Sequence, residues 1–260
     1  MKIAIIGAGK MGSWLARMLS SGNEVAVYDR DAARAQVCAG AGKITALPAL
    51  SGLSGFRPQM LINAASIQNT VAAFGEARPF LGDDCIICDV ASIKSGLEEY
   101  YSECGLRFAS VHPMFGPTFA EMDALREENA IIISSSDPEG KAFFTSFFGS
   151  LGVRIFEYSF AEHDRMMAYS LTTPFVASLV FAACMDGAAV PGSTFARHRK
   201  IAKGLLSEDD SLLSEILFNP HSLSQLDKIT SRLEFLKHII KARDSEEMTD
   251  FLAKLRKNIG

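Results

Sequence analysis

Short apolar runs alternate with helical or turn-rich stretches through the first 160 or so residues of the chain. The runs are five or six residues long and rich in β-branched side chains, as expected of buried strands. They occupy residues 2–6, 24–28, 60–64, 85–90, 106–111, 130–134 and 153–158. This alternation predicts an α/β domain built on a doubly wound sheet.

Helical spacing replaces this alternation in the last hundred residues. After a capping box at Ser159-Phe-Ala-Glu162, an apolar helical pattern runs to Met185. Pro174 interrupts it, and we expect a kink there. Leucines and isoleucines three and four residues apart predict a one-faced helix over residues 222–240, and Asp244 opens a final helix.

These patterns divide the chain into two predicted domains. Residues 1–158 form the α/β domain, and residues 159–260 form an all-α helical domain. The side chains around the proline, such as Phe175 and Leu179, are too apolar to remain in water. We expect them to be buried in a helical bundle or in a subunit interface.

Composition excludes several classes of function. The chain has 260 residues, 22% of them charged, and a net charge of −4, so no basic field favours nucleic acid or an acidic membrane. The longest apolar run, residues 174–185, is too short to span a bilayer, and the N-terminus lacks a signal-peptide pattern. Five scattered cysteines fit a reducing cytosol, so we expect a cytoplasmic protein. We interpret Cys85 and Cys88 as core thiols, not metal ligands, because residues three apart on a strand point to opposite faces.

A glycine-rich turn follows the first predicted strand. Gly7, Gly9 and Gly12 form a Gly-x-Gly-x-x-Gly motif between that strand and a helical pattern. Gly7 makes the tight turn, Gly9 lets the backbone approach a pyrophosphate, and Gly12 lets the helix pack on the strand. The helix start, with Lys10 and Met11, supplies amide donors for phosphates. The motif predicts a Rossmann-type domain that binds a dinucleotide.

Acidic and small residues at later strand ends refine this prediction. Asp29 ends the second strand, at the spacing of the carboxylate that bonds an adenosine ribose, which favours NAD over NADP. Arg30 beside it could accept the extra phosphate of NADP. Ala64 follows the third strand where a cofactor ribose could pass, although a plain loop explains it equally well.

Two further stretches carry candidate chemistry. Asp89, Ser92 and Lys94 follow the fourth strand and bring charged and hydroxyl groups to the same sheet edge, although Asp89 or Ser92 could instead cap a helix. We assign Asp89 to the cofactor site. His112 begins a stiff loop, His-Pro-Met-Phe-Gly-Pro, and could act as a general base or serve as a structural histidine.

Together these motifs resemble one family. The glycine motif, Asp-x-x-Ser-x-Lys, His-Pro-Met-Phe-Gly-Pro and the later Glu-His-Asp-Arg-Met-Met-Ala, at 162–168, are similar in order and spacing to the prephenate/arogenate dehydrogenases of tyrosine biosynthesis. The resemblance spans nearly the whole chain and is closest to the short, single-function bacterial members.

The resemblance implies an enzyme that passes a hydride from the substrate ring to NAD while the ring carboxylate leaves as carbon dioxide. His112 matches the family's catalytic histidine, and Ser92 matches the serine that aligns it. No metal is implied, and the family dimerises through its helical domain, so a homodimer is expected. The substrate, prephenate or arogenate, stays open.

The chain departs from the family pattern at the substrate carboxylate. Where many relatives have an arginine, this sequence has Gly204. We hypothesise that Lys203, with Arg197 or His198, replaces it, although these residues also fit a solvated basic helix face. Thr118 stands where some relatives have an acidic residue near the substrate side chain.

Two other functions fit parts of the sequence. Other nicotinamide oxidoreductases with a helical second domain share the glycine motif but do not pair it with the histidine loop. A regulator that senses NAD would explain the nucleotide site alone, and the complete set of candidate catalytic residues argues against it.

Overall fold

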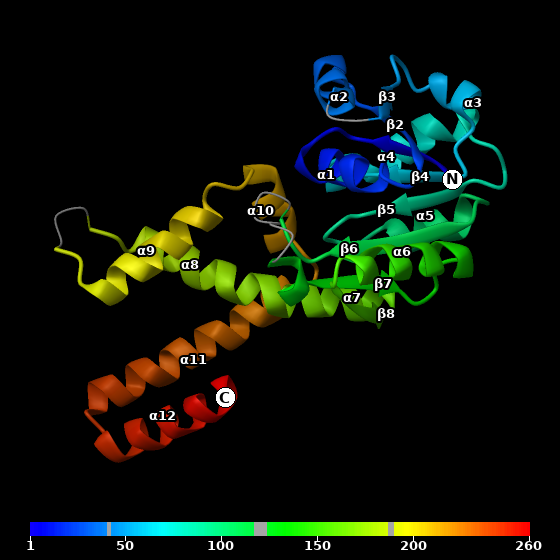
Figure 1. The fold of residues 1–260 in the computed structure, drawn as a ribbon. Coiled ribbons are helices and arrows are strands. Elements are labelled where there is room, and N and C mark those ends of the chain that lie inside the picture. The colour runs from blue at the N-terminus through cyan, green and yellow to red at the C-terminus, as the bar shows by residue number, and fades with distance from the viewer. Residues whose placement is uncertain (41–42, 117–123, 187–189) are drawn as a thin grey trace. The chain divides into compact units, whose positions relative to one another are not determined.

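The computed structural model describes residues 1–40, 43–116, 124–186 and 190–260. Its elements form two compact units, Met1–Met167 and Ala168–Gly260 (Figure 1). The first unit is a sheet covered by helices, and the second consists of helices. The predicted fold class, an α/β Rossmann-type sheet followed by a helical region, is confirmed.

One eight-stranded sheet forms the first unit, in the order β3-β2-β1-β4-β5-β6-β7-β8. Neighbouring strands pair in parallel except β6 and β7, which are antiparallel. The strands are β1 Lys2–Ile6, β2 Glu24–Tyr28, β3 Ile44–Ala46, β4 Met60–Asn63, β5 Ile86–Asp89, β6 Phe108–Pro113, β7 Asn129–Ile133 and β8 Arg154–Tyr158.

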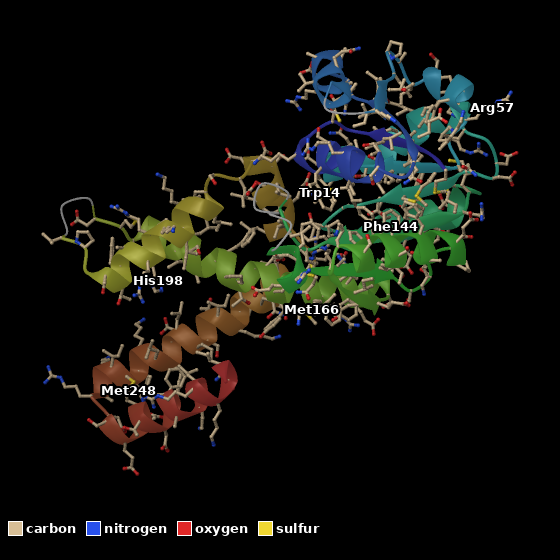
Figure 2. The ribbon with its side chains drawn as sticks, in the orientation of Figure 1. Trp14, Arg57, Phe144, Met166, His198 and Met248 are labelled. Carbon is tan, nitrogen blue, oxygen red and sulfur yellow. The ribbon has the colours of Figure 1, made fainter. Side chains whose placement is uncertain are left out.

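Helices cover both faces of this sheet because alternate strand residues point to opposite sides. On one face pack α1 (Lys10–Leu19), α2 (Ala32–Ala39) and α6 (Pro138–Ser150), with Trp14 and Phe144 in the core (Figure 2). The other face carries α3 (Gly52–Phe56), α4 (Thr70–Ala77), α5 (Leu97–Glu103) and α7 (Phe160–Met167). Short 3-10 turns complete the unit at Ile67–Asn69, Arg78–Phe80 and Ala124–Glu127.

The two cysteines of the Cys-x-x-Cys sequence lie in different cores. Cys88 packs with the α1 face and Cys85 with the α3 face, as predicted for residues three apart on a strand. Both are free thiols, and burial raises the pKa of Cys85 to about 11. Inert thiols of this kind stabilise the core by packing.

Strand predictions from the sequence match the structure closely, with two differences. The three-residue strand β3, Ile44–Ala46, was not predicted because it is too short to show a periodic pattern. Strand β7 runs antiparallel to β6, a direction that apolar runs do not encode.

Helix α7 belongs to the first unit, so the boundary lies nine residues beyond the predicted one. The predicted capping box forms: the Ser159 amide donates to Glu162 Oε2 over 2.8 Å, and the Glu162 amide donates to Ser159 Oγ over 3.3 Å. Phe160 is buried on the sheet and holds this helix there. This apolar contact between α7 and the sheet places the boundary between the two units after α7. A helical sequence pattern does not show such a contact.

In its described residues, the second unit contains a π-helical turn at Ala168–Thr172 followed by five α-helices (Figure 1). The turn lies directly before Pro174, where the sequence predicted a kink, and such turns relieve a break in the hydrogen-bond ladder. Thr172 Oγ1 and Ser222 Oγ, both buried, lie 2.8 Å apart and tie the turn to α11. The helices are α8 Thr173–Ala183, α9 Ser193–Leu205, α10 Asp210–Leu217, α11 Ser222–Ala242 and α12 Ser245–Ile259.

The helical stretch Phe160–Ala183 is 24 residues long and contains an 18-residue window with a mean hydropathy of 1.5. By length and composition it could cross a membrane, which the shorter run 174–185 could not. A core or interface helix of a soluble protein meets the same criterion. Its first turns carry Glu162, His163, Asp164 and Arg165, which are costly to place in lipid.

Gly12→Ala tests the close packing of α1 on β1. A methyl group at Gly12 would lie 1.8 Å from the carbonyl oxygen of Gly7, so the helix must move away. We expect the free energy of unfolding, measured by urea denaturation, to fall by roughly 2–3 kcal/mol or more.

The matched control is Gly75→Ala in the exposed face of α4, where an added methyl group meets nothing within 4 Å. Higher helix propensity should leave that variant as stable as the parent or more stable by up to about 1 kcal/mol. Equal stability of the two variants would disprove the packing role of Gly12.

Candidate active site

Several predicted site residues lie at one edge of the sheet, at the carboxyl ends of parallel strands. Gly7, Ala64 and His112 follow or end β1, β4 and β6, whose carboxyl ends point the same way. The strand order reverses between β1 and β4, because β1 is flanked by β2 on one side and by β4 on the other. Open α/β sheets bind ligands at such a switch point.

Two glycines shape the turn at the switch point. Gly7 has a φ of +94°, and a side chain there would also meet the Ala64 carbonyl oxygen at 2.6 Å. Only glycine adopts this conformation without strain. An added carbon at Gly9 meets nothing within 4 Å, so its backbone borders open space at the start of α1, where Lys10 and Met11 follow. The turn at Gly7 is as predicted, and the approach of Gly9 to a pyrophosphate stays a prediction.

A cavity of about 410 Å³ opens beside this turn. Its lining brings together five predicted cofactor residues that are far apart in sequence: Gly7, Gly9, Asp29, Arg30 and Ala64. Arg34 and Ser66 also line it. The cavity has the position and volume of a nucleotide site.

Asp29 organises the rim of this cavity. Its Oδ2 accepts from the Ala8 amide over 2.7 Å, and its Oδ1 accepts from the Asp31 amide over 2.8 Å. The carboxylate therefore holds the glycine turn against the end of β2, and each oxygen keeps a further lone pair for a ribose hydroxyl. Arg30, exposed beside it, is the group that would meet a 2′-phosphate.

His112 lies inside β6 with only 6% of its surface exposed. Its Nδ1 is 3.0 Å from Nε2 of His163 on α7. Among the described residues, Nε2 of His112 has no hydrogen-bond partner. Burial, the His163 ring and the Lys94 ammonium lower the pKa of His112 well below 6.5. The ring is therefore neutral at pH 7 and able to accept a proton.

Asp164 anchors the second histidine. Its Oδ1 lies 3.0 Å from His163 Nδ1 and also accepts from the Lys94 amide over 2.9 Å. The Ser95 hydroxyl donates to Oδ2 over 2.9 Å. Burial raises the pKa of Asp164, but these hydrogen bonds outweigh burial and hold the pKa below its usual value. Asp164 is therefore an ionised, acceptor-only group.

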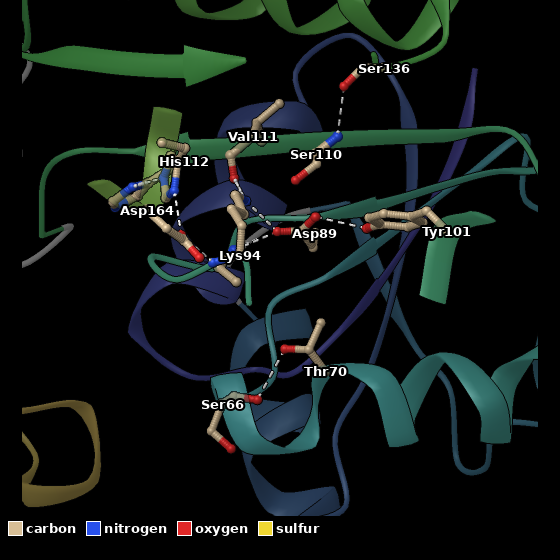
Figure 3. Close-up of polar contacts among 12 residues, drawn as sticks. Ser66, Thr70, Asp89, Lys94, Tyr101, Ser110, Val111, His112, Ser136 and Asp164 are labelled. Carbon is tan, nitrogen blue, oxygen red and sulfur yellow. Dashed lines mark hydrogen bonds and ion pairs between the residues drawn. The ribbon is translucent and has the colours of Figure 1, made fainter. Parts of the chain in front are cut away.

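A buried ion pair lies beneath the histidines. Lys94 Nζ contacts Asp89 Oδ1 and donates to the Val111 carbonyl over 2.8 Å, while the Tyr101 hydroxyl donates to Asp89 Oδ2 over 2.7 Å (Figure 3). The side chains of Asp89 and Lys94 are fully buried. Burial lowers the pKa of Lys94, and the Asp89 carboxylate opposes that shift.

The prediction that Asp89 binds the cofactor is corrected by this geometry. Asp89 has no exposed surface, and both oxygens bond within the protein, to Lys94, Tyr101 and the Ala91 amide. The sequence could not separate a buried carboxylate at a sheet edge from one that faces a ligand. Asp89 instead fixes the base of the site.

Comparisons with known proteins agree with this arrangement. The family model "Prephenate dehydrogenase, nucleotide-binding domain" matches residues 15–146, slightly more than half of the chain. The chain belongs to the prephenate dehydrogenase family. Its first domain is a nucleotide-binding domain, as the glycine motif predicted.

Solved structures of family members share the fold. A prephenate dehydrogenase from Aquifex aeolicus, in complex with hydroxyphenyl propionate and NAD+, superposes with a TM-score of 0.85 at 17% identity, covering 99% of this chain and 96% of that one. The structure of Synechocystis arogenate dehydrogenase superposes with a TM-score of 0.77 at 20% identity, covering 99% of this chain and 98% of that one.

Curated relatives are longer. Arogenate dehydrogenase 1, chloroplastic, from Arabidopsis thaliana is 25% identical over 272 aligned positions, which cover 98% of this chain and 41% of that protein. The chain spans less than half the length of the curated relatives it matches.

For the remaining predicted residues, the structure describes no hydrogen bond to His112. Ser92 is half-buried in the loop after β5, and the hydrogen bond described for the His112 ring is the one it shares with His163, so the role of Ser92 stays a prediction. Three exposed residues, Arg197, His198 and Lys203, lie on α9 of the second unit. Thr118 lies outside the described residues.

Sequence reasoning missed His163 and Asp164 as site residues. Both belong to the Glu-His-Asp segment that carried the family resemblance, but helical periodicity alone gives no reason for a histidine and an aspartate to be buried. Their burial, with 0% and 7% of their surfaces exposed, is the signal, and only the packed structure reveals it.

Proposed function

We propose that this protein is an NAD-dependent prephenate dehydrogenase that forms 4-hydroxyphenylpyruvate in tyrosine biosynthesis. One observation carries the proposal: a buried, neutral His112 ends a strand at the same sheet edge as the nucleotide cavity. Family membership supports a dehydrogenase, and the substrate class follows from the relatives. Arogenate, which carries an amino group where prephenate has a keto group, is the alternative substrate.

The chemistry needs a base and little else from the protein. NAD, when bound, would supply the acceptor for the hydride of ring C4 and its two electrons. His112 takes the C4 hydroxyl proton, so the oxygen can become a carbonyl and then the phenol. The bond to the ring carboxylate breaks, carbon dioxide leaves, its electron pair completes the aromatic ring, and the resulting phenolate takes the proton back from His112. Because aromatisation drives the reaction, orientation and proton removal are the protein's main contributions.

The residues around the cavity fit NAD. Gly7 and Gly9 leave backbone open for the pyrophosphate, and the start of α1 points amides at it. Asp29 offers its carboxylate to the ribose hydroxyls and would repel a 2′-phosphate. Arg30 and Arg34 on the same rim keep some use of NADP chemically feasible.

Recognition of the substrate carboxylates needs cations. We assign this role to Lys203, with Arg197 or His198, on α9. His198 is the most constrained of the three, since its Nδ1 lies 3.0 Å from the Thr194 carbonyl and its ring 5.7 Å from that of Phe181.

We further propose that two copies of the chain associate through their helical units. Helix α8 contains no buried residue although it is mostly apolar, and Val180 exposes 49% of its surface. Helix α11 also carries exposed leucines and isoleucines: Leu223 exposes 74% of its surface and Ile240 exposes 61%. Apolar surface of this extent is typical of an interface between subunits.

Purified protein supplied with NAD and either prephenate or arogenate should produce reduced nicotinamide, followed by its absorbance. His112→Asn removes the base and should lower kcat by about 10²–10⁴-fold while NAD still binds. Because the pKa of His112 is lowered, kcat/KM should stay constant from pH 8 down to 6.5 and fall only at lower pH.

Turnover of only one substrate would decide between prephenate and arogenate. Full activity in His112→Asn would remove the histidine from the chemistry, and no turnover of either substrate would reject the dehydrogenase.

Lys203→Ala should raise the KM for the substrate roughly 10–100-fold with little change in kcat, as expected for loss of one charge-assisted hydrogen bond. Lys228→Ala on α11 removes the same charge from another exposed helix position and should leave KM unchanged. An unaltered KM in Lys203→Ala would reject its role.

Sedimentation equilibrium should give twice the 28.2 kDa mass of one chain. Val180→Asp places a charge on the α8 surface and should shift the protein to monomer. Val37→Asp, at a site 77% exposed on α2, should not. A monomeric parent protein would contradict the proposed interface.

A further inference from the structure

Outside the chemistry assigned to His112, the first unit contains a second buried histidine with its own carboxylate. The chain of contacts runs from His112 through His163 to Asp164, with two spacings of 3.0 Å. All three residues belong to the first unit, on β6 and α7. A buried histidine pair in contact is costly unless each ring has a defined donor and acceptor.

Proton positions along this chain follow from its anchored end. Asp164 is ionised and accepts hydrogen bonds only, so His163 Nδ1 must carry a proton and donate to it. In a neutral His163 the Nε2 atom is then an acceptor. The partner facing it, Nδ1 of His112, must therefore be the donor. The single proton of neutral His112 is on Nδ1, and its Nε2 carries the lone pair.

We propose that His163 and Asp164 are positioning residues that hold His112 in this one tautomer, with Nε2 as the atom that takes the substrate proton. This inference rests on the proposed function only for the identity of the substrate. The bonding itself is a property of the free protein.

The same contacts keep the His112 ring in one orientation during proton transfer. When the hydroxyl O–H bond breaks and an N–H bond forms at Nε2, His112 becomes positively charged. The Nδ1–H bond to His163 then becomes charge-assisted and keeps the ring oriented, while burial and the His163 ring lower the pKa of His112 and so favour release of the captured proton. The Lys94 ammonium opposes this charge, but it is paired with Asp89. Asp164 is itself fixed by the Lys94 amide and the Ser95 hydroxyl, so the chain of contacts is held in place before the substrate binds.

Nitrogen-15 NMR of histidine-labelled protein at pH 7.5 reads the tautomer directly, without substrate. We expect His112 to show a protonated Nδ1 and an unprotonated Nε2. In His163→Leu the acceptor is lost, so both tautomers of His112 should appear, and kcat should fall roughly 10–100-fold with a smaller change in the substrate KM.

Conservative and control variants separate positioning from mere packing. The amide oxygen of His163→Gln can replace the Nε2 acceptor, so this variant should recover much of the kcat lost in His163→Leu. His238→Leu, on the exposed surface of α11, should leave both the NMR pattern and kcat unchanged. The acid limb of kcat/KM should also move in His163→Leu, because the neighbouring ring lowers the pKa of His112.

A protonated Nε2 on His112 in the parent protein would overturn the proposal, as would a His163→Leu variant that folds and retains its kcat. These outcomes differ from failure of the proposed function. If neither prephenate nor arogenate is turned over but the NMR pattern is as expected, the tautomer assignment stands and the substrate assignment falls.

Discussion

Lys94 makes the contacts on which the rest of the site depends. Its ammonium joins Asp89 at the end of β5 to the Val111 carbonyl in β6, and its amide donates to Asp164 on α7. Three elements far apart in sequence are therefore fixed by one residue that is 1% exposed. Removing one partner of such a pair leaves an unpaired buried charge, which typically costs about 3–5 kcal/mol. The ion pair thus contributes mainly by defining a single arrangement of these elements.

That arrangement separates the site into two chemical environments along one sheet edge. At the switch point between β1 and β4, backbone amides, open glycines and a carboxylate border a cavity suited to a dinucleotide. At the end of β6, buried side chains keep a histidine neutral and oriented. Parallel strands place both at the same edge, so hydride acceptor and proton acceptor can serve one substrate. The fold supplies proximity, and burial supplies the right protonation state.

Helix α7 has a larger part in the site than its sequence suggested. The predicted boundary assigned it to the helical domain, because its pattern is continuous with the apolar residues after it. In the structure Phe160 packs on the sheet, and the next turn brings His163 and Asp164 to His112. The helical region thus begins with residues that complete the nucleotide-binding unit, and the π-helical turn before Pro174 marks where that unit ends.

The sequence by itself determined the strands other than β3, the glycine turn, the position of His112 at a sheet edge and the family. Each of these depends on local chemistry: β-branched runs, a φ that only glycine tolerates, and the order of short motifs. Tertiary structure decided which charged groups are buried and which partners they find. The structure shows Asp89, which was predicted to bind the cofactor, in a buried ion pair with Lys94. It also shows His163 as the hydrogen-bond partner of His112. His112 and His163 are 51 positions apart, and the burial of the Asp89–Lys94 pair depends on the elements packed around it, so neither periodicity nor motif spacing records these contacts.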